Sequence, residues 1–214
     1  MFGNEMRDDI EGFILAGGAS SRMGKDKGQL KLAGYTFVAR INEALLSIAG
    51  STNIVGAKED DARFGLQIVP DVYAGWGALG GLHAALDACR ARWALVVACD
   101  LPFASAELFT RLASLCGNFD AVVPVQMDAR PQPLCALYRA AACRARAQEL
   151  IEMQERRPRA LLQAVNTRLV AWEELADLKD AAILLMNVNT PEDYAEARAT
   201  QVLIANAKGS KSAG

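Results

Sequence analysis

Short apolar runs alternate with segments of helical spacing through the first part of the chain. Such runs are typical of strands buried on both faces, and the segments between them are typical of amphipathic helices. The predicted strands are residues 11–15, 53–55, 66–69, 93–97 and 121–125. The predicted helices are residues 37–49, 82–91 and 105–115, the last with Ser105 as its N-cap and Gly117 as its stop. The alternation predicts a three-layer α/β/α fold with a mostly parallel sheet.

The pattern changes after residue 125. An apolar run at residues 134–138 follows with no helix before it, so we expect it to pair antiparallel or to form an insertion. Two helical stretches and two further strands at the sheet edge should follow. These are helices 140–154 and 159–165 and strands 169–172 and 184–188. Thr190 and Pro191 suit the cap and first turn of a closing helix over residues 191–199.

Some segments are expected to lack regular structure. Glycines dominate residues 75–81, which we expect to form a loop, and the small and polar residues of 205–214 should fray. The chain shows no internal repeat and no linker. We therefore expect a single domain over residues 1–214, with its core at about residues 11–200 and flexible ends.

Composition narrows the class of protein. The 214 residues are 52% hydrophobic with a net charge of −2, which argues against a general nucleic-acid-binding protein. The chain has no apolar run near the roughly 20 residues of a membrane helix, and residues 1–9 contain no apolar signal region. The five cysteines form no CxxC pair, so we interpret them as buried thiols of a reduced compartment. These features favour a cytoplasmic protein without a membrane partner.

The segment after the first predicted strand has the chemistry of a phosphate-binding loop. Residues 15–27 read LAGGASSRMGKDK. Gly17 and Gly18 would let the backbone approach a ligand closely, and Arg22, Lys25 and Lys27 add positive charge. The spacing matches neither a Walker A loop nor a dinucleotide GxGxxG fingerprint. A triphosphate site and a merely basic surface loop both remain open from spacing alone.

Two acidic residues follow predicted strands. Asp100 comes just after the apolar run 93–97, at the edge of the sheet where α/β proteins bind ligands. A carboxylate there suits Mg²⁺, and a metal role is favoured over helix capping because Pro102 and Ser105 already supply turn and cap. Asp71 lies at the end of strand 66–69, where it is either a ligand contact or a turn residue.

The carboxyl-terminal part holds further polar candidates. Asn187 and Asn189 are two residues apart, so on an extended segment their amides point to one face and can bind a pterin or a phosphate. A helix start explains Thr190 and Pro191 but leaves Asn187 unexplained. Arg130 is a lesser candidate in the loop 126–134. His83, the only histidine, is interpreted as a packed or surface residue.

Three motifs together resemble one enzyme family. LAGGASSRMGKDK at residues 15–27, CDLP at 99–102 and NVNTP at 187–191 are similar to the signatures of molybdenum cofactor guanylyltransferases. The resemblance implies a Rossmann-like nucleotidyltransferase topology. It implies nucleotide contacts at Leu15, Ala16, Gly17, Gly18, Lys27, Asp71 and Asp100, a Mg²⁺ ligand at Asp100, phosphate contacts at Arg22 and Lys27, and acceptor contacts at Asn187 and Asn189. The chain departs from the family at Ala78, where proline is usual, and near residue 56, where an asparagine contact is often found.

The function implied by the resemblance is transfer of GMP from GTP to the phosphate of molybdenum-molybdopterin, with Arg22, Lys27 and Asp100 as catalytic residues. A phosphate monoester is already anionic near neutral pH, so no histidine base is needed. Implied partners are the enzyme that inserts molybdenum and the recipient molybdoenzymes. The alternatives are cytidylyl transfer to the same cofactor, nucleotidyl transfer to a sugar phosphate, and a nucleotide-binding regulatory or adaptor protein without catalysis.

Overall fold

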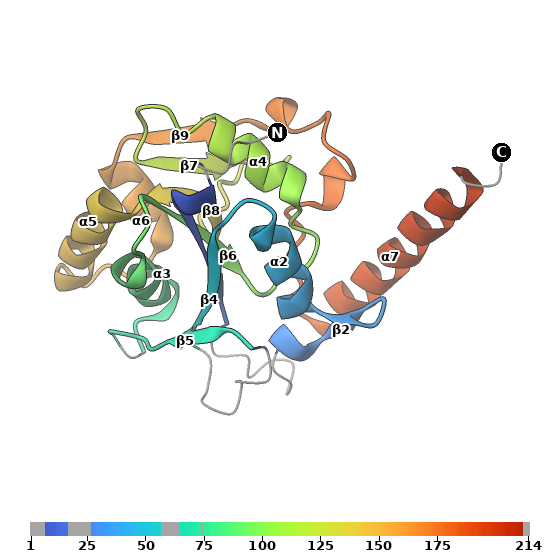
Figure 1. The fold of residues 1–214 in the computed structure, drawn as a ribbon, viewed down its shortest axis with the longest axis horizontal. Coiled ribbons are helices and arrows are strands. Elements are labelled where there is room, and N and C mark those ends of the chain that lie inside the picture. Colours follow the sequence, from blue (N-terminus) through green and yellow to red (C-terminus); the bar gives the residue numbers. More distant parts are fainter. Residues whose placement is uncertain (1–6, 17–26, 57–64, 74, 212–214) are drawn as a thin grey trace.

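A seven-stranded sheet forms the centre of the molecule (Figure 1). The computed structural model describes residues 7–16, 27–56, 65–73 and 75–211, with side chains to residue 206. The strands run in the order β5-β4-β1-β6-β8-β7-β9. Their bounds are β1 Ile10–Leu15, β4 Ser51–Val55, β5 Gln67–Val69, β6 Trp93–Ala98, β7 Ala121–Pro124, β8 Cys135–Arg139 and β9 Thr167–Val170. Only β8 runs antiparallel to its neighbours, which confirms the antiparallel pairing expected for residues 134–138.

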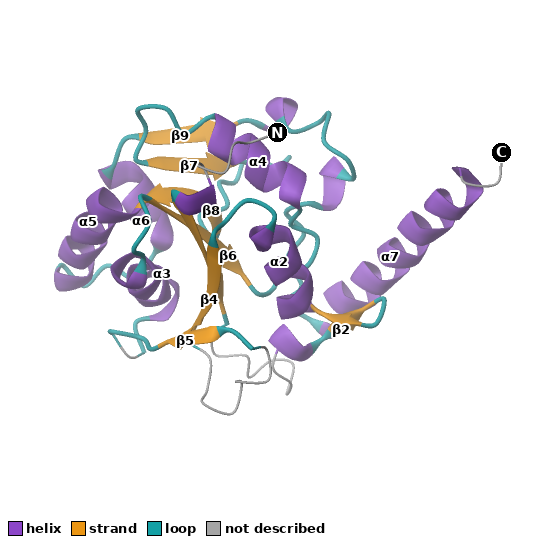
Figure 2. Cartoon of the chain, viewed as in Figure 1, coloured by secondary structure: helices purple, strands orange, loops and turns teal. Residues whose placement is uncertain are grey.

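Helices cover both faces of this sheet (Figure 2). The helices α2 (Phe37–Leu46) and α4 (Ala106–Ser114) pack on one face. The other face carries α3 (Gly77–Ala88), α5 (Ala140–Glu152) and α6 (Pro158–Ala164). The three-layer α/β/α fold expected from the sequence is therefore confirmed.

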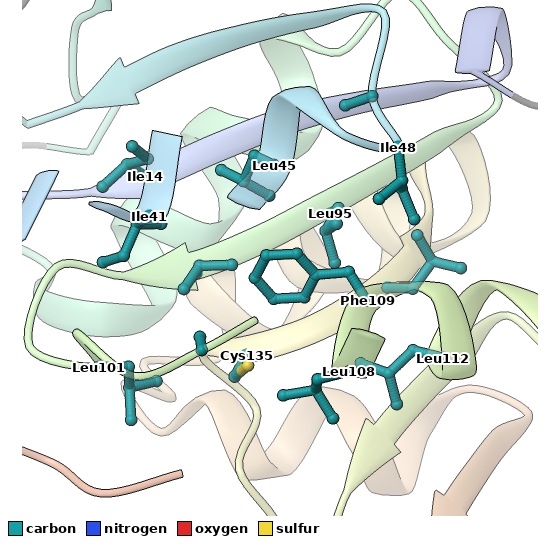
Figure 3. Close-up of a cluster of buried hydrophobic side chains, with 14 of the residues drawn as sticks. Ile14, Ile41, Leu45, Ile48, Leu95, Leu101, Leu108, Phe109, Leu112 and Cys135 are labelled. Carbon is teal, nitrogen blue, oxygen red and sulfur yellow. The ribbon is translucent and has the colours of Figure 1, made fainter. Parts of the chain in front are cut away.

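The central strand β6 shows why the apolar runs become strands. All six of its residues are buried, because helices cover the sheet on both sides. Leu95 and Val97 point into the core under α2 and α4, whereas Ala94 and Val96 point into the core under α3 and α5. Figure 3 shows the first of these cores, where Phe109 of α4 lies among aliphatic side chains from α2 and the sheet.

The chain order places a topological switch point between β1 and β6. From β1 the chain passes through α2 to β4 and β5 on one side, and then crosses through α3 to β6 on the other side. The two crossovers lie on opposite faces, so the connections that follow β1 and β6 leave the sheet in opposite directions. Ligands of doubly wound sheets bind at this position.

The remaining elements lie on the side of the sheet that carries α2 and α4. The short helix η2 (Lys27–Gln29) leads into a hairpin of β2 (Lys31–Leu32) and β3 (Tyr35–Thr36), which the apolar pattern did not predict. The helix α7 (Pro191–Lys211) packs its first turns on this hairpin and then extends away from the body (Figure 1). The short helices η4 (Trp172–Glu174) and η5 (Ala181–Ile183) connect β9 to α7. None of the helices described here has the length and apolar character needed to cross a bilayer.

Two local predictions are wrong. The glycines at 77–81 belong to α3 rather than to a loop, because Leu79 and Leu82 are buried on the side of α3 that packs on the sheet, which continues the helix back to Gly77. Residues 184–188 form no strand, because the Val188 N–H donates to the Asp100 carbonyl rather than to a sheet edge. The closing helix predicted over residues 191–199 is confirmed as α7, which extends further, to Lys211.

The glycines of α3 give a test of this packing. A Cβ at Gly80 would lie 2.7 Å from the Cβ of Trp76, whereas a Cβ at Gly81 would meet only Leu15 Cδ1 at 3.9 Å. We expect Gly80→Ala to lower the free energy of unfolding by about 1–3 kcal/mol through overpacking. Gly81→Ala should instead raise it by up to about 1 kcal/mol through helix propensity. Urea unfolding of both variants measures this difference, and equal effects would contradict the close approach.

Candidate active site at the end of β6

Asp100 lies immediately beyond β6, at the switch point of the sheet. Its backbone carbonyl accepts a hydrogen bond from the Val188 N–H at 2.8 Å, which joins the end of β6 to the segment before α7. Its side chain is 19% exposed and faces Lys27, with 3.8 Å between Asp100 Oδ2 and Lys27 Nζ. The preceding residue, Cys99, donates its N–H to the Leu15 carbonyl at 3.0 Å, which fixes the ends of β1 and β6 side by side.

Two amide side chains extend this cluster from Asp100. Asn187 Nδ2 donates to Asp100 Oδ1 at 3.4 Å, and Gln132 Nε2 donates to Asn187 Oδ1 at 2.8 Å. Asn187 comes from the segment before α7 and Gln132 from the β7–β8 connection. These hydrogen bonds therefore link the β7–β8 connection and the segment before α7 to the carboxylate at the end of β6.

Lys27 connects the other asparagine to the same centre. Its Nζ donates to Asn189 Oδ1 at 2.7 Å, so Lys27 lies between Asn189 and Asp100. Asn189 is held by the start of α7, where Asp193 Oδ2 accepts the N–H groups of Asn189 and Thr190 at 2.8 and 2.9 Å. The Asp193 N–H in turn donates to Thr190 Oγ1 at 3.1 Å, which completes a reciprocal cap.

The electrostatics of the cluster favour a cationic ligand at Asp100. Burial raises the pKa of the Asp100 carboxyl, because removal from water disfavours its charged form, while Lys27 and the Asn187 amide partly offset this shift. No group of three or more His, Cys, Asp or Glu side chains suited to a metal occurs among the described residues. A single carboxylate still fits Mg²⁺, which commonly takes one or two carboxylates and completes its shell with phosphates and water.

The other predicted nucleotide contacts lie along the same edge. Leu15 ends β1 with its side chain buried, and Ala16 continues the backbone with its N–H donating to the Val55 carbonyl at 2.9 Å. Asp71 follows β5 and is exposed. Because β4 and β1 lie between β5 and β6, Asp71 and Asp100 are separated by about three strand spacings, or roughly 14 Å. Asp71 therefore does not join the Asp100 cluster.

Three predicted residues, Gly17, Gly18 and Arg22, lie outside the described residues. The lesser candidate Arg130 is exposed and pairs with Asp128 of its own loop at 2.5 Å. His83 is buried, with its ring 5.0 Å from that of Tyr73, and this burial lowers its pKa. It is a packed residue, as the sequence indicated.

Gln132 was not among the predicted site residues, although the loop 126–134 that contains it was singled out through Arg130. The visible signal is the Pro131-Gln132-Pro133 triplet, in which two prolines restrict the backbone on either side of one polar residue. Three of the five cysteines, Cys99, Cys135 and Cys143, are buried as the sequence indicated, whereas Cys89 and Cys116 are partly exposed. Burial raises the pKa of Cys135 and Cys143 to about 12, so both stay protonated as small apolar residues.

A doubly wound sheet with a carboxylate, a lysine and three amides at its switch point is typical of an α/β protein that binds a nucleotide. The sequence matches the MobA-like NTP transferase domain over residues 12–171. The chain belongs to this family and is a nucleotidyltransferase.

Individual relatives agree with this assignment. The chain is 36% identical over 188 residues to a probable molybdenum cofactor guanylyltransferase of Pelotomaculum thermopropionicum, covering 87% of this chain and 91% of that protein. It is 31% identical to a probable enzyme of the same name from Bacillus cereus, covering 87% and 94%. The crystal structure of molybdopterin-guanine dinucleotide biosynthesis protein A from Archaeoglobus fulgidus superposes with a TM-score of 0.76 at 25% identity, covering 89% and 97%.

The cap that holds Asn189 can be tested by its effect on stability. We expect Asp193→Ala to lower the free energy of unfolding by about 1 kcal/mol, because the N–H groups at the start of α7 lose their acceptor. Glu192→Ala removes a carboxylate from the same helical turn without a hydrogen bond to those groups, and should cost only a few tenths of a kcal/mol. Urea unfolding distinguishes the two. Equal losses would show that charge at the helix terminus, rather than the cap, stabilises this segment.

Proposed function

We propose that this nucleotidyltransferase transfers GMP from GTP to the phosphate of molybdenum-molybdopterin, forming molybdopterin guanine dinucleotide and pyrophosphate. The observation that carries the proposal is the meeting of Lys27, Asp100, Asn187 and Asn189 at the switch point of the sheet. The names of relatives that match nearly the whole chain support the choice of GTP and of the acceptor.

Asp100 is the proposed ligand of Mg²⁺, and the metal would neutralise charge on the triphosphate and hold its oxygens. The half-buried carboxylate at the strand end supports this role, because its charge lacks full solvation by water. We propose no other carboxylate ligand from the described residues.

The nucleotide is proposed to lie along the carboxyl ends of β5, β4 and β1. Asp71 would position its nucleoside part, at roughly 14 Å from Asp100 by strand spacing. The backbone at the end of β1 would contact it through Leu15, Ala16, Gly17 and Gly18. Lys27 and Arg22 would neutralise the phosphates. Lys27 suits this task because its Nζ contacts the Asn189 amide oxygen and the Asp100 carboxylate, and a phosphate oxygen can replace either partner.

The acceptor is proposed to enter from the side of Asn187 and Asn189. An oxygen of the acceptor phosphate attacks the α-phosphorus of GTP in line with the leaving group. A new P–O bond forms, the bond between the α-phosphorus and the bridging oxygen breaks, and pyrophosphate leaves with the electron pair. The acceptor oxygen is already anionic, so the chain has to align and stabilise charge rather than remove a proton.

We also propose the domain organisation, the compartment and the partner proteins of the enzyme. We propose a single-domain cytoplasmic protein over residues 1–214 that exchanges its cofactor with the enzyme that inserts molybdenum and with recipient molybdoenzymes. Neither nucleic acid nor a membrane is a proposed partner.

The choice of nucleotide and acceptor is tested by pyrophosphate release. We expect the purified protein with Mg²⁺ and molybdenum-molybdopterin to release pyrophosphate with GTP and not with CTP or ATP. Release with CTP would keep the site and overturn the choice of base. Release only with a sugar phosphate as acceptor would overturn the choice of acceptor. Binding of GTP without release for any acceptor would identify a nucleotide-binding protein without catalysis.

The role of Asp100 is tested by substitution. We expect Asp100→Ala to lower kcat by about 100-fold or more, because the charged groups of the transition state lose a preorganised partner. The matched control Asp128→Ala removes an exposed carboxylate that pairs only with Arg130 of its own loop, and should leave kcat within about twofold. Melting temperatures monitor the fold of both variants. Near-normal turnover by Asp100→Ala would exclude Asp100 from the metal role.

A further inference from the structure

Gln132 is held in place more firmly than a loop residue usually is. It lies between two prolines in the β7–β8 connection. Its N–H donates to the Pro124 carbonyl at 2.9 Å, and its carbonyl accepts from the Cys135 N–H at 3.1 Å. The next carbonyl, that of Pro133, accepts from the buried Tyr138 hydroxyl at 2.7 Å. The backbone of Gln132 is therefore fixed from both sides, and its side chain starts from a defined position.

The side chain of Gln132 meets only one end of the Asn187 amide. Gln132 Nε2 donates to Asn187 Oδ1 at 2.8 Å, while Asn187 Nδ2 donates to Asp100 Oδ1 at 3.4 Å. An asparagine amide has one accepting end and one donating end. If Asn187 were reversed, its oxygen would face the Asp100 carboxylate and its NH₂ group would face the NH₂ group of Gln132. Only the observed orientation satisfies both contacts.

We propose that Gln132 is a positioning residue that fixes the orientation of the Asn187 amide and so directs its NH₂ group at Asp100. The catalytic consequence rests on the proposed function, because it assumes that Asp100 handles the nucleotide. The orientation itself is a property of the chain without nucleotide or metal.

The backbone contacts of the segment that carries Asn187 do not reach the Asn187 side chain, whereas Gln132 does. The segment that carries Asn187 is not part of the sheet, so other groups must hold its backbone. The Val188 N–H bonds to the Asp100 carbonyl at 2.8 Å, and Gln126 Nε2 donates to the Leu185 carbonyl at 3.0 Å. These two bonds fix the backbone on both sides of Asn187. Neither bond determines which way the amide faces. The Asp100 carboxylate can only accept, so it selects the NH₂ end of Asn187, and Gln132 holds the opposite end by donating to Asn187 Oδ1.

The first measurement follows the Asn187 amide directly. In ¹H–¹⁵N spectra of the protein without nucleotide or metal, the Asn187 side-chain NH₂ signals are assigned by their absence in Asn187→Ala. A glutamate at position 132 can only accept, so Gln132→Glu should turn the NH₂ group away from Asp100 and move these signals. Gln163→Glu makes the same chemical change at an exposed position of α6 and should leave them unmoved. Unchanged signals in Gln132→Glu, or equal shifts in both variants, would overturn the proposal.

The second measurement is a double-mutant cycle on turnover. We expect Gln132→Glu to lower kcat by about 10-fold to 100-fold, as for loss of a hydrogen bond to a charged group. The KM for GTP should stay within about twofold, and the melting temperature within about 4 °C. In the Asn187→Ala background the same substitution should have no further effect, because the two residues act as one unit. A full additional loss there would overturn the proposal.

These two measurements separate this proposal from the proposed function. If the parent enzyme releases no pyrophosphate with any nucleotide and acceptor, the proposed function fails. The amide spectra still decide the orientation of Asn187, because they need neither substrate.

Discussion

The site depends on one backbone hydrogen bond, from the Val188 N–H to the Asp100 carbonyl at 2.8 Å. Asp100 is placed by β6, whose six residues are buried and cannot shift without loss of the core. Residues 184–188 belong to no strand, so the sheet does not place them. The bond transfers the rigidity of β6 to this segment. Asn187 and Asn189, on either side of Val188, are thereby brought to Asp100 and Lys27.

Burial of the Asp100 carboxylate is energetically unfavourable, and its neighbours reduce this desolvation penalty. A carboxylate with 19% side-chain exposure loses much of its hydration, which is why its pKa is raised. The distances show that the compensation is incomplete in the free enzyme. Lys27 Nζ is 3.8 Å from the carboxylate but only 2.7 Å from Asn189 Oδ1. Asp100 therefore keeps the capacity for a stronger cationic partner, and Lys27 keeps the capacity to receive an anion.

The sequence predicted the sheet and most of the cluster because both leave strong local signals. Apolar runs covered by helices on both faces identify β1, β4 and β6, and a polar residue directly after such a run identifies Asp100. Two predictions are wrong because the local pattern of the sequence does not show the packing that decides these segments. Residues 77–81 join α3 because Leu79 is buried in the core with Leu82, although the surrounding glycines resemble a loop. Residues 184–188 leave the sheet because the Val188 N–H bonds to the distant strand end at Asp100, a contact without a local pattern. Gln132 was not predicted because its partner, Asn187, lies far away in the sequence on another segment of the fold.

The two sides of the site are built by different means. The expected nucleotide side follows parallel strands, where Ala16 and Gly56 each donate an N–H to the carbonyl of a neighbouring strand. The expected acceptor side consists of Asn187 and Asn189, which come from a connection and are held by the side chain of Gln132 and by the cap of α7. Connections tolerate changes in length and sequence better than central strands do. A chain of this construction can change its acceptor by altering these connections while the end of β6 and Asp100 stay as they are. Under the proposed function, the orientation of Asn187 would belong to the part of the site that distinguishes acceptors, and the Asp100 carboxylate to the part common to nucleotidyl transfer.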